Sequence, residues 1–134
     1  MPMARIASGG ELARIMLALK STLSDKDGVG TVIYDEIDAG VSGKTARKIG
    51  VKMLELSKAS QLICVTHSAQ IASLADTHML IKKRELDGSV RTELSVLDYD
   101  GRVGEVSRIL GGINVTEAQR KAAIDMLEEK NGLS

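Results

Sequence analysis

The sequence contains no phenylalanine and no tryptophan, and its only aromatic residues are two tyrosines. The core of this 134-residue chain must therefore be built from leucine, isoleucine, valine, methionine and alanine. The single cysteine, Cys64, excludes an internal disulfide and a zinc cluster made of cysteines. No apolar run reaches the roughly 18 residues of a membrane span, and no signal peptide is visible. We expect one soluble, cytoplasmic domain that makes no membrane contact.

The sequence also has no excess of positive or negative charge. The 18 basic and 18 acidic residues cancel to a formal net charge of zero. This balance argues against a globally basic nucleic-acid-binding surface. One local basic run, Lys82-Lys83-Arg84, is compatible with phosphate contact, although a solvated face explains it as well.

Apolar periodicity predicts an α/β fold. Short apolar runs indicate buried strands at Thr31–Tyr34 and Gln61–Thr66. Helical spacing indicates helices at about Ser8–Leu23, Gly43–Ser57 and Ala69–Leu74. A strand–helix–strand order with short loops implies a parallel pair of strands with a right-handed crossover.

In the second half of the chain, the sequence pattern predicts a β-hairpin followed by two helices. The expected elements are hairpin strands at His78–Arg84 and Val90–Leu97, a turn at Asp100-Gly101, a helix from Arg102 to Leu110 ended by Gly111-Gly112, and a last helix from Thr116 to Lys130 with Gln119 at the capping-box position.

Two acids follow the first predicted strand directly, and they are either a solvated strand end or part of a site. A buried carboxylate needs a cation, a donor or a proton, and ligands bind at the carboxyl ends of parallel strands. Asp35 is therefore a candidate ligand for Mg²⁺. Glu36 is a candidate for polarising an attacking water. His67 ends the next strand and could face the same crevice, in contact with a phosphoryl group.

Two glycine-containing segments could bind phosphate. Ser8-Gly9-Gly10-Glu11 has capping-box spacing, and its backbone N–H groups at a helix N-terminus also suit an anion. Gly43-Lys44-Thr45 resembles the end of a phosphate loop, but Asp38 stands where that loop requires its first glycine.

Taken together, the motifs resemble the heads of ABC-type ATPases of the SMC-like group. Ala7–Glu11 is similar to the ABC signature, and Val32–Glu36 to a Walker B motif with its catalytic glutamate. The segment from Asp38 to Ser42 lies where the D-loop belongs, and Val65–His67 is similar to the switch-histidine loop. The resemblance covers nearly the whole chain and implies a partial head with a mainly parallel sheet, flanking helices and a C-terminal hairpin.

The resemblance also implies a role and partners. It implies ATP hydrolysis with Mg²⁺ at a head–head dimer interface, in a nucleoid-associated protein of DNA double-strand break repair and recombination. Asp35 would hold the metal, and Glu36 and His67 would be catalytic. The nucleotide-binding residues it implies are Ser8, Gly9, Gly10, Glu11 and Ser42, the first three of them touching ATP held by the partner head.

No phosphate loop stands before Ser8, and no coiled coil is present in the sequence. We therefore expect the C-terminal half of a head, residues 1–134, which needs the N-terminal half of its own head, meets DNA through the full-length protein and is inactive alone. We also expect the strand at Gln61–Thr66 to expose an edge that self-association or His78–Arg84 would cover.

Three alternatives stay open. The chain is a non-catalytic dimerisation or DNA-binding module, or it is a standalone P-loop NTPase that uses Lys44. A transporter ATPase subunit is a weaker alternative, because such subunits usually carry proline where this chain has Ile37.

Overall fold

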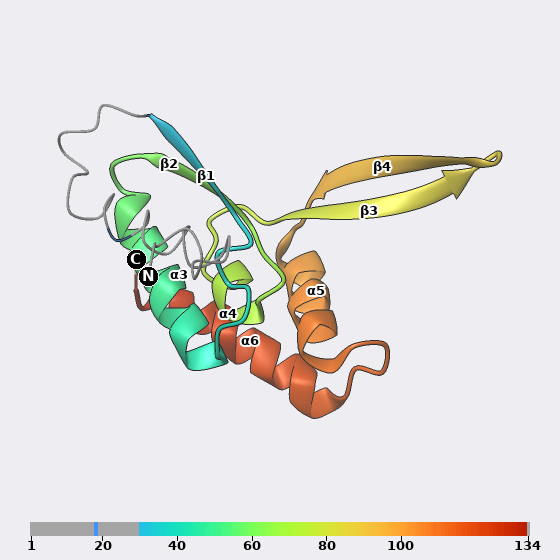
Figure 1. The fold of residues 1–134 in the computed structure, drawn as a ribbon. Coiled ribbons are helices and arrows are strands. Elements are labelled where there is room, and N and C mark those ends of the chain that lie inside the picture. Colours follow the sequence, from blue (N-terminus) through green and yellow to red (C-terminus); the bar gives the residue numbers. More distant parts are fainter. Residues whose placement is uncertain (1–17, 19–29, 134) are drawn as a thin grey trace, which may run out of the picture. The chain divides into compact units, whose positions relative to one another are not determined.

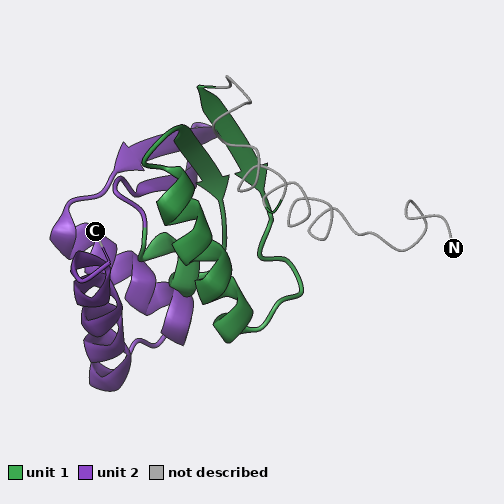
Figure 2. Ribbon diagram, turned by 90° about the vertical axis from the view of Figure 1, so that its left-hand side faces the viewer, with its two compact units in different colours: residues 1–74 green, residues 75–134 purple. Residues whose placement is uncertain are grey.

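The computed structural model describes residue 18 and residues 30–133. The chain divides into two compact units, residues 1–74 and residues 75–134 (Figure 2). The helix expected at Ser8–Leu23 lies outside the described residues, apart from residue 18. In the part of the chain that is described, no helix is long and apolar enough to cross a membrane.

From residue 30 onward, the first unit contains a two-stranded parallel sheet and two helices (Figure 1). Strand β1 spans Thr31–Asp35 and strand β2 spans Gln61–Val65, and they pair residue for residue from Thr31↔Gln61 to Asp35↔Val65. Helix α3, Gly43–Leu56, connects them, and the short helix α4, Ala69–Ala72, follows β2. The predicted strand–helix–strand order is confirmed.

One face of the sheet packs against α3. The alternation of a β-strand places successive side chains on opposite faces, so Tyr34 is 4% exposed while its neighbour Ile33 is 67% exposed. The buried cluster is aliphatic apart from this tyrosine and consists of Tyr34, Ile37, Ala46, Ile49, Met53 and Ile71. The aliphatic core predicted from the composition is present.

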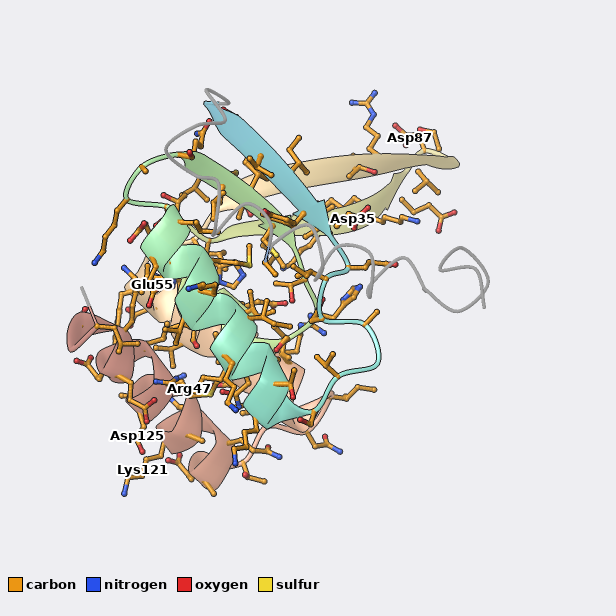
Figure 3. The ribbon with its side chains drawn as sticks, turned by 60° about the vertical axis from the view of Figure 1, so that its left-hand side comes forward. Asp35, Arg47, Glu55, Asp87, Lys121 and Asp125 are labelled. Atoms are coloured by element: carbon orange, nitrogen blue, oxygen red, sulfur yellow. The ribbon has the colours of Figure 1, made fainter. Side chains whose placement is uncertain are left out.

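The second unit begins with an antiparallel hairpin. Strands β3, Met79–Leu86, and β4, Ser89–Val96, pair along their full length. Asp87 and Gly88 form the two-residue turn, both with positive φ (51° and 76°), as the tightest hairpin turns require. Figure 3 shows Asp87 at the tip of the hairpin. The turn is shorter than the predicted Leu86–Ser89 loop.

Two packed helices complete this unit: α5, Tyr99–Gly111, and α6, Glu117–Asn131. Their buried apolar residues are Val103, Val106, Ala123 and Leu127. The Tyr99 hydroxyl donates a 2.8 Å hydrogen bond to Glu128 Oε1 across the pair. The capping box predicted at Thr116 and Gln119 is confirmed in both of its hydrogen bonds.

One expectation is wrong, and one of two alternatives for another is excluded. Asp100-Gly101 is not a turn before a helix, because Asp98 caps α5 and its Oδ1 accepts a 2.8 Å hydrogen bond from the Gly101 N–H, which places both residues in the first helical turn. The second concerns the edge of β2, where the sequence left two possibilities. His78–Arg84 does not cover this edge, because β3 pairs with β4 and, among the described strands, β2 pairs with β1 alone, so self-association stays a prediction.

Candidate functional site

The two strands of the parallel sheet end together, and the residues selected from the sequence lie at that edge. Asp35 is the last residue of β1 and is paired with Val65, the last residue of β2 (Figure 3). Glu36 and Thr66 follow these positions, and His67 comes next. The Glu36 N–H donates a 3.1 Å hydrogen bond to the Val65 carbonyl, which extends the strand ladder by one residue. The backbones that carry Asp35, Glu36 and His67 therefore converge, as predicted.

The acids are exposed rather than buried. Asp35, Glu36 and His67 are all solvent-exposed. The premise that Asp35 and Glu36 are buried is therefore wrong, for a reason of strand geometry. Tyr34 takes the inward position next to α3, so Asp35 points to the opposite face, and the strand ends there. Exposed side chains at a sheet edge remain available to a ligand that arrives from outside.

Glu36 has an unusual backbone. Its φ is +55°, in the left-handed region that non-glycine residues occupy at a cost of roughly 1–2 kcal/mol. The following turn closes when the Ala39 N–H donates a 3.1 Å hydrogen bond to the Glu36 carbonyl. The strand ladder before Glu36 and the turn after it hold the residue in this conformation. Such strained residues cluster at functional sites.

Asp38 is the residue that the sequence prediction undervalued. Its Oδ2 accepts a 2.7 Å hydrogen bond from the Thr66 hydroxyl and a 3.3 Å hydrogen bond from the His67 N–H. Both Asp38 and Thr66 are half-buried. The sequence motif placed Asp38 at the start of the D-loop, but it gave no sign that its carboxylate joins the loop after β1 to the loop after β2. The signal available in the sequence was an acceptor, Asp38, and a donor, Thr66, each just beyond one of two strands expected to pair.

The helix α3 start is capped by a serine. Ser42 has extended backbone geometry, and its Oγ accepts a 3.3 Å hydrogen bond from the Thr45 N–H, while its hydroxyl lies 3.1 Å from Thr45 Oγ1. Lys44 lies on the outer face of α3 and lines a shallow surface pocket together with Arg47, Lys48, Val51, Lys52 and Glu55. Figure 3 shows Arg47 and Glu55 on this helix. Lys44 is thus one of several basic residues on this surface of α3.

Burial and negative charge act together beneath the carboxyl edge. They raise the pKa of the Cys64 thiol to about 11, with burial as the larger cause and the charges of Asp38 and Asp35 as the further ones. Cys64 is therefore a protonated, half-buried side chain that packs against the core cluster. This placement agrees with the role of a small core residue rather than a nucleophile.

The residues at this edge can hold Mg²⁺ only together with ligands from elsewhere. The exposed carboxylate of Asp35 offers hard oxygens, whereas Asp38 already accepts two hydrogen bonds. Within residue 18 and residues 30–133, no group of three or more His, Cys, Asp or Glu side chains is arranged to hold a metal ion. Mg²⁺ commonly takes one or two carboxylates and completes its shell with water and substrate phosphates. Ser8, Gly9, Gly10 and Glu11 lie outside the described residues.

No protein-family model matches the chain. Individual proteins do match it over nearly its whole length. It is 44% identical over 127 residues to DNA repair protein RecN of Halalkalibacterium halodurans, a stretch that is 95% of this chain and 22% of that protein. It is 40% identical over 127 residues to RecN of Bacillus subtilis and 48% identical over 111 residues to RecN of Treponema pallidum. The chain is homologous to RecN.

The similarity to RecN has a defined extent. The chain spans about a fifth of the length of these relatives, 22% for the first two and 19% for the third. The matched stretch lies in their C-terminal part. The resemblance inferred from the motifs is confirmed, because these relatives are named DNA repair protein RecN.

A solved structure supports the fold. It comes from work described as structural biochemistry of ATP-driven dimerization and DNA stimulated activation of SMC ATPases. Its TM-score is 0.58 at 23% sequence identity, with 82% of this chain and 66% of that chain covered. The predicted α/β fold, with a parallel sheet, flanking helices and a hairpin, is confirmed, and it is similar to the fold of that SMC ATPase.

Proposed function

We propose that the chain supplies part of an ATPase head of a RecN-like protein that acts in DNA double-strand break repair and recombination. The observation that carries the proposal is the meeting of the loops after β1 and β2, where the Glu36 N–H bonds Val65 and the Asp38 carboxylate bonds Thr66 and His67. The names of the RecN relatives support the repair context, and the SMC-like fold supports a head.

Each side chain at this edge has a distinct role in the proposal. An Asp35 oxygen would hold Mg²⁺, which when bound would supply positive charge beside the phosphate oxygens of ATP. The Glu36 carboxylate orients water and accepts its proton as the water oxygen attacks the γ-phosphorus. The bond from that phosphorus to the ADP oxygen then breaks, which gives ADP and phosphate. The imidazole of His67 contacts the phosphoryl group during transfer.

Two heads share the nucleotide in this proposal. Ser8, Gly9, Gly10 and Glu11 contact ATP held by the partner head, and Ser42 lies in the loop that faces across the dimer. The phosphate loop comes from the N-terminal half of the same head, and DNA is met by the full-length protein. The structural neighbour, which comes from work on ATP-driven dimerization of SMC ATPases, supports a dimer of heads.

The experiment measures ATP hydrolysis and ATP-dependent dimerisation of the full-length protein with three side chains tested. Glu36→Gln should abolish turnover while it retains ATP binding and stabilises the dimer, because the substrate stays uncleaved. Ser8→Arg should abolish dimerisation, because it places bulk and charge at the shared nucleotide. Lys44→Ala should leave both unchanged. Turnover by Glu36→Gln at the wild-type rate would contradict the proposal.

The same experiment separates the alternatives. Loss of nucleotide binding in Lys44→Ala, with Ser8→Arg harmless, would favour a standalone NTPase. ATP-independent dimerisation or DNA binding without Glu36-dependent turnover would favour a non-catalytic module. The 134-residue chain is assayed beside the full-length protein, and Glu36-dependent turnover by the chain alone would contradict the expectation that its phosphate loop comes from elsewhere.

A further inference from the structure

One carboxylate oxygen joins the two loops that carry Glu36 and His67. Asp38 Oδ2 accepts hydrogen bonds from the Thr66 hydroxyl at 2.7 Å and from the His67 N–H at 3.3 Å. The Thr66 Oγ1 in turn accepts a 3.0 Å hydrogen bond from the Ser68 N–H. Two successive residues of the loop after β2 are therefore bonded to Asp38 in the loop after β1, and the third, Ser68, is bonded to Thr66.

The two hydrogen bonds to Asp38 belong to the stronger kind. The acceptor is an ionised carboxylate, and charge-assisted hydrogen bonds are about twice as strong as neutral ones. Asp38 and Thr66 are half-buried, so water competes less for the carboxylate than it would on an open surface. The Asp38 backbone is also held, because its carbonyl accepts a 3.3 Å hydrogen bond from the Val41 N–H. Both ends of this connection are thus fixed.

The connection spans the loop between two side chains with proposed chemical roles. Asp38 stands two residues after Glu36, and its second partner is His67 itself. A loose loop after β2 would let His67 move relative to Glu36, since the strand ladder ends with the bond from Glu36 to Val65. Misplacement of a reacting group by about 1 Å can lower a rate by roughly 10²-fold.

We propose that Asp38 is a positioning residue, which holds the Thr66–His67 segment at a fixed place beside Glu36 through a shared carboxylate oxygen. The inference rests on the proposed ATPase function and adds a residue and a mechanism to it. Asp38 does not touch the nucleotide in this scheme. Its removal should therefore lower kcat for ATP hydrolysis and leave KM for ATP unchanged, because substrate binding does not depend on the connection.

The test uses the full-length protein and paired substitutions. Asp38→Asn weakens the acceptor, and Thr66→Val removes the donor hydroxyl while it keeps the side-chain shape. Each should lower kcat by about 10- to 10²-fold with KM unchanged. Thr66→Ser restores the hydroxyl and should recover most of kcat. Asp87→Asn is the matched control, because it removes one carboxylate charge from the hairpin turn, where asparagine accepts the positive φ.

A double substitution shows whether the two residues act as a unit. The Asp38→Asn/Thr66→Val protein should be no slower than the worse single variant, because residues that share one interaction are not additive. Additive losses in kcat, or a loss in Thr66→Ser equal to that in Thr66→Val, would overturn the inference. Wild-type kcat in Asp38→Asn, with Glu36→Gln inactive, would overturn it and leave the proposed function standing. Full turnover in Glu36→Gln would instead contradict the proposed function.

Discussion

The Glu36 N–H donates a 3.1 Å hydrogen bond to the Val65 carbonyl, one position beyond the last strand pair, Asp35 and Val65. The bond lets the β1–β2 ladder run one residue further while the chain turns away with φ of +55° at Glu36. The residue proposed to handle the attacking water is thus held at the point where the ladder ends and the turn begins. Its side chain is exposed to solvent, and its backbone conformation carries a cost.

This cost gives the first prediction. Glu36→Gly removes a strain of roughly 1–2 kcal/mol and adds about 0.5–1 kcal/mol of chain entropy lost on folding. We expect the free energy of unfolding to stay unchanged or to rise by about 1 kcal/mol, while activity is lost. Equilibrium urea unfolding measures the first quantity.

The neighbouring position supplies the control for Glu36. Asp35 lies in the regular strand with no positive φ, so Asp35→Gly should lower the free energy of unfolding by about 0.5–1 kcal/mol. Equal losses in Glu36→Gly and Asp35→Gly would mean that the left-handed backbone of Glu36 carries no cost.

Gly50 gives the second prediction, because α3 and α4 approach closely there. A Cβ at Gly50 would lie 2.8 Å from Leu74 Cδ1 and 3.5 Å from the Gln70 carbonyl oxygen. Gly50→Ala gains about 1 kcal/mol of helix propensity but overpacks a buried contact at a cost of about 1–3 kcal/mol. We expect a net loss in the free energy of unfolding, measured by urea titration.

Gly104 is the matched control for Gly50. It also lies inside a helix, α5, but a Cβ there would meet nothing within 4 Å. Gly104→Ala should therefore raise the free energy of unfolding by up to about 1 kcal/mol. A gain at both positions would show that the α3–α4 contact can absorb a methyl group.

Elements that depend on local signals were predicted well from the sequence, whereas features that depend on other parts of the chain were not. Helices α3 and α6 were predicted nearly to the residue, because the apolar period of both and the cap of α6 at Thr116 are local signals, whereas the cap of α3 at Ser42 was not predicted. The start of α5 was missed, because Asp100-Gly101 has turn composition and the decisive cap, Asp98, lies just before it.

The site shows the same division. That Asp35, Glu36 and His67 meet at one edge follows from the order of strand, helix and strand. The exposure of the acids depends on which residue of β1 faces α3, and Tyr34 takes that place. The hydrogen bond from Thr66 to Asp38 joins residues 28 positions apart and requires the β1–β2 register, which short sequence motifs do not specify.

Cys64 gives the third prediction, a dependence on pH. Its thiol pKa is raised to about 11 by burial first and by Asp38 and Asp35 next. At pH 8 the thiolate fraction should be roughly 10²-fold below that of an ordinary cysteine. Alkylation by iodoacetamide should therefore be slow at pH 8 and should rise steeply up to about pH 11. Rapid alkylation of the native protein at pH 8 would contradict the burial argument.

The sign of the Cys64 effect on stability follows from the same shift. The folded pKa lies above the unfolded value near 9, so the contribution to stability is complete below pH 9 and is lost as the pH rises towards 11. Asp38→Asn removes one of the charges that disfavour the thiolate. It should therefore speed alkylation at a fixed pH, whereas Asp87→Asn in the hairpin should not.

The junction of α5 and α6 gives the fourth prediction. Gln119 Oε1 accepts a 2.8 Å hydrogen bond from the Thr116 N–H as half of the capping box. The same Gln119 oxygen lies where a Cβ on Gly111 would clash with it. Gly111→Ala should displace the Gln119 side chain and break this hydrogen bond, at a cost of about 1 kcal/mol in the free energy of unfolding.

A double-mutant cycle isolates the effect at Gly111. With Gln119→Ala already in place, the clash is gone and the capping bond is already lost, so Gly111→Ala should cost much less than in the wild type. Thr116→Ala, which removes the other half of the box, should cost about 1 kcal/mol on its own. Urea unfolding of the single and double variants measures the coupling. Strict additivity would show that Gly111 is required for its backbone alone and not for the space it leaves to Gln119.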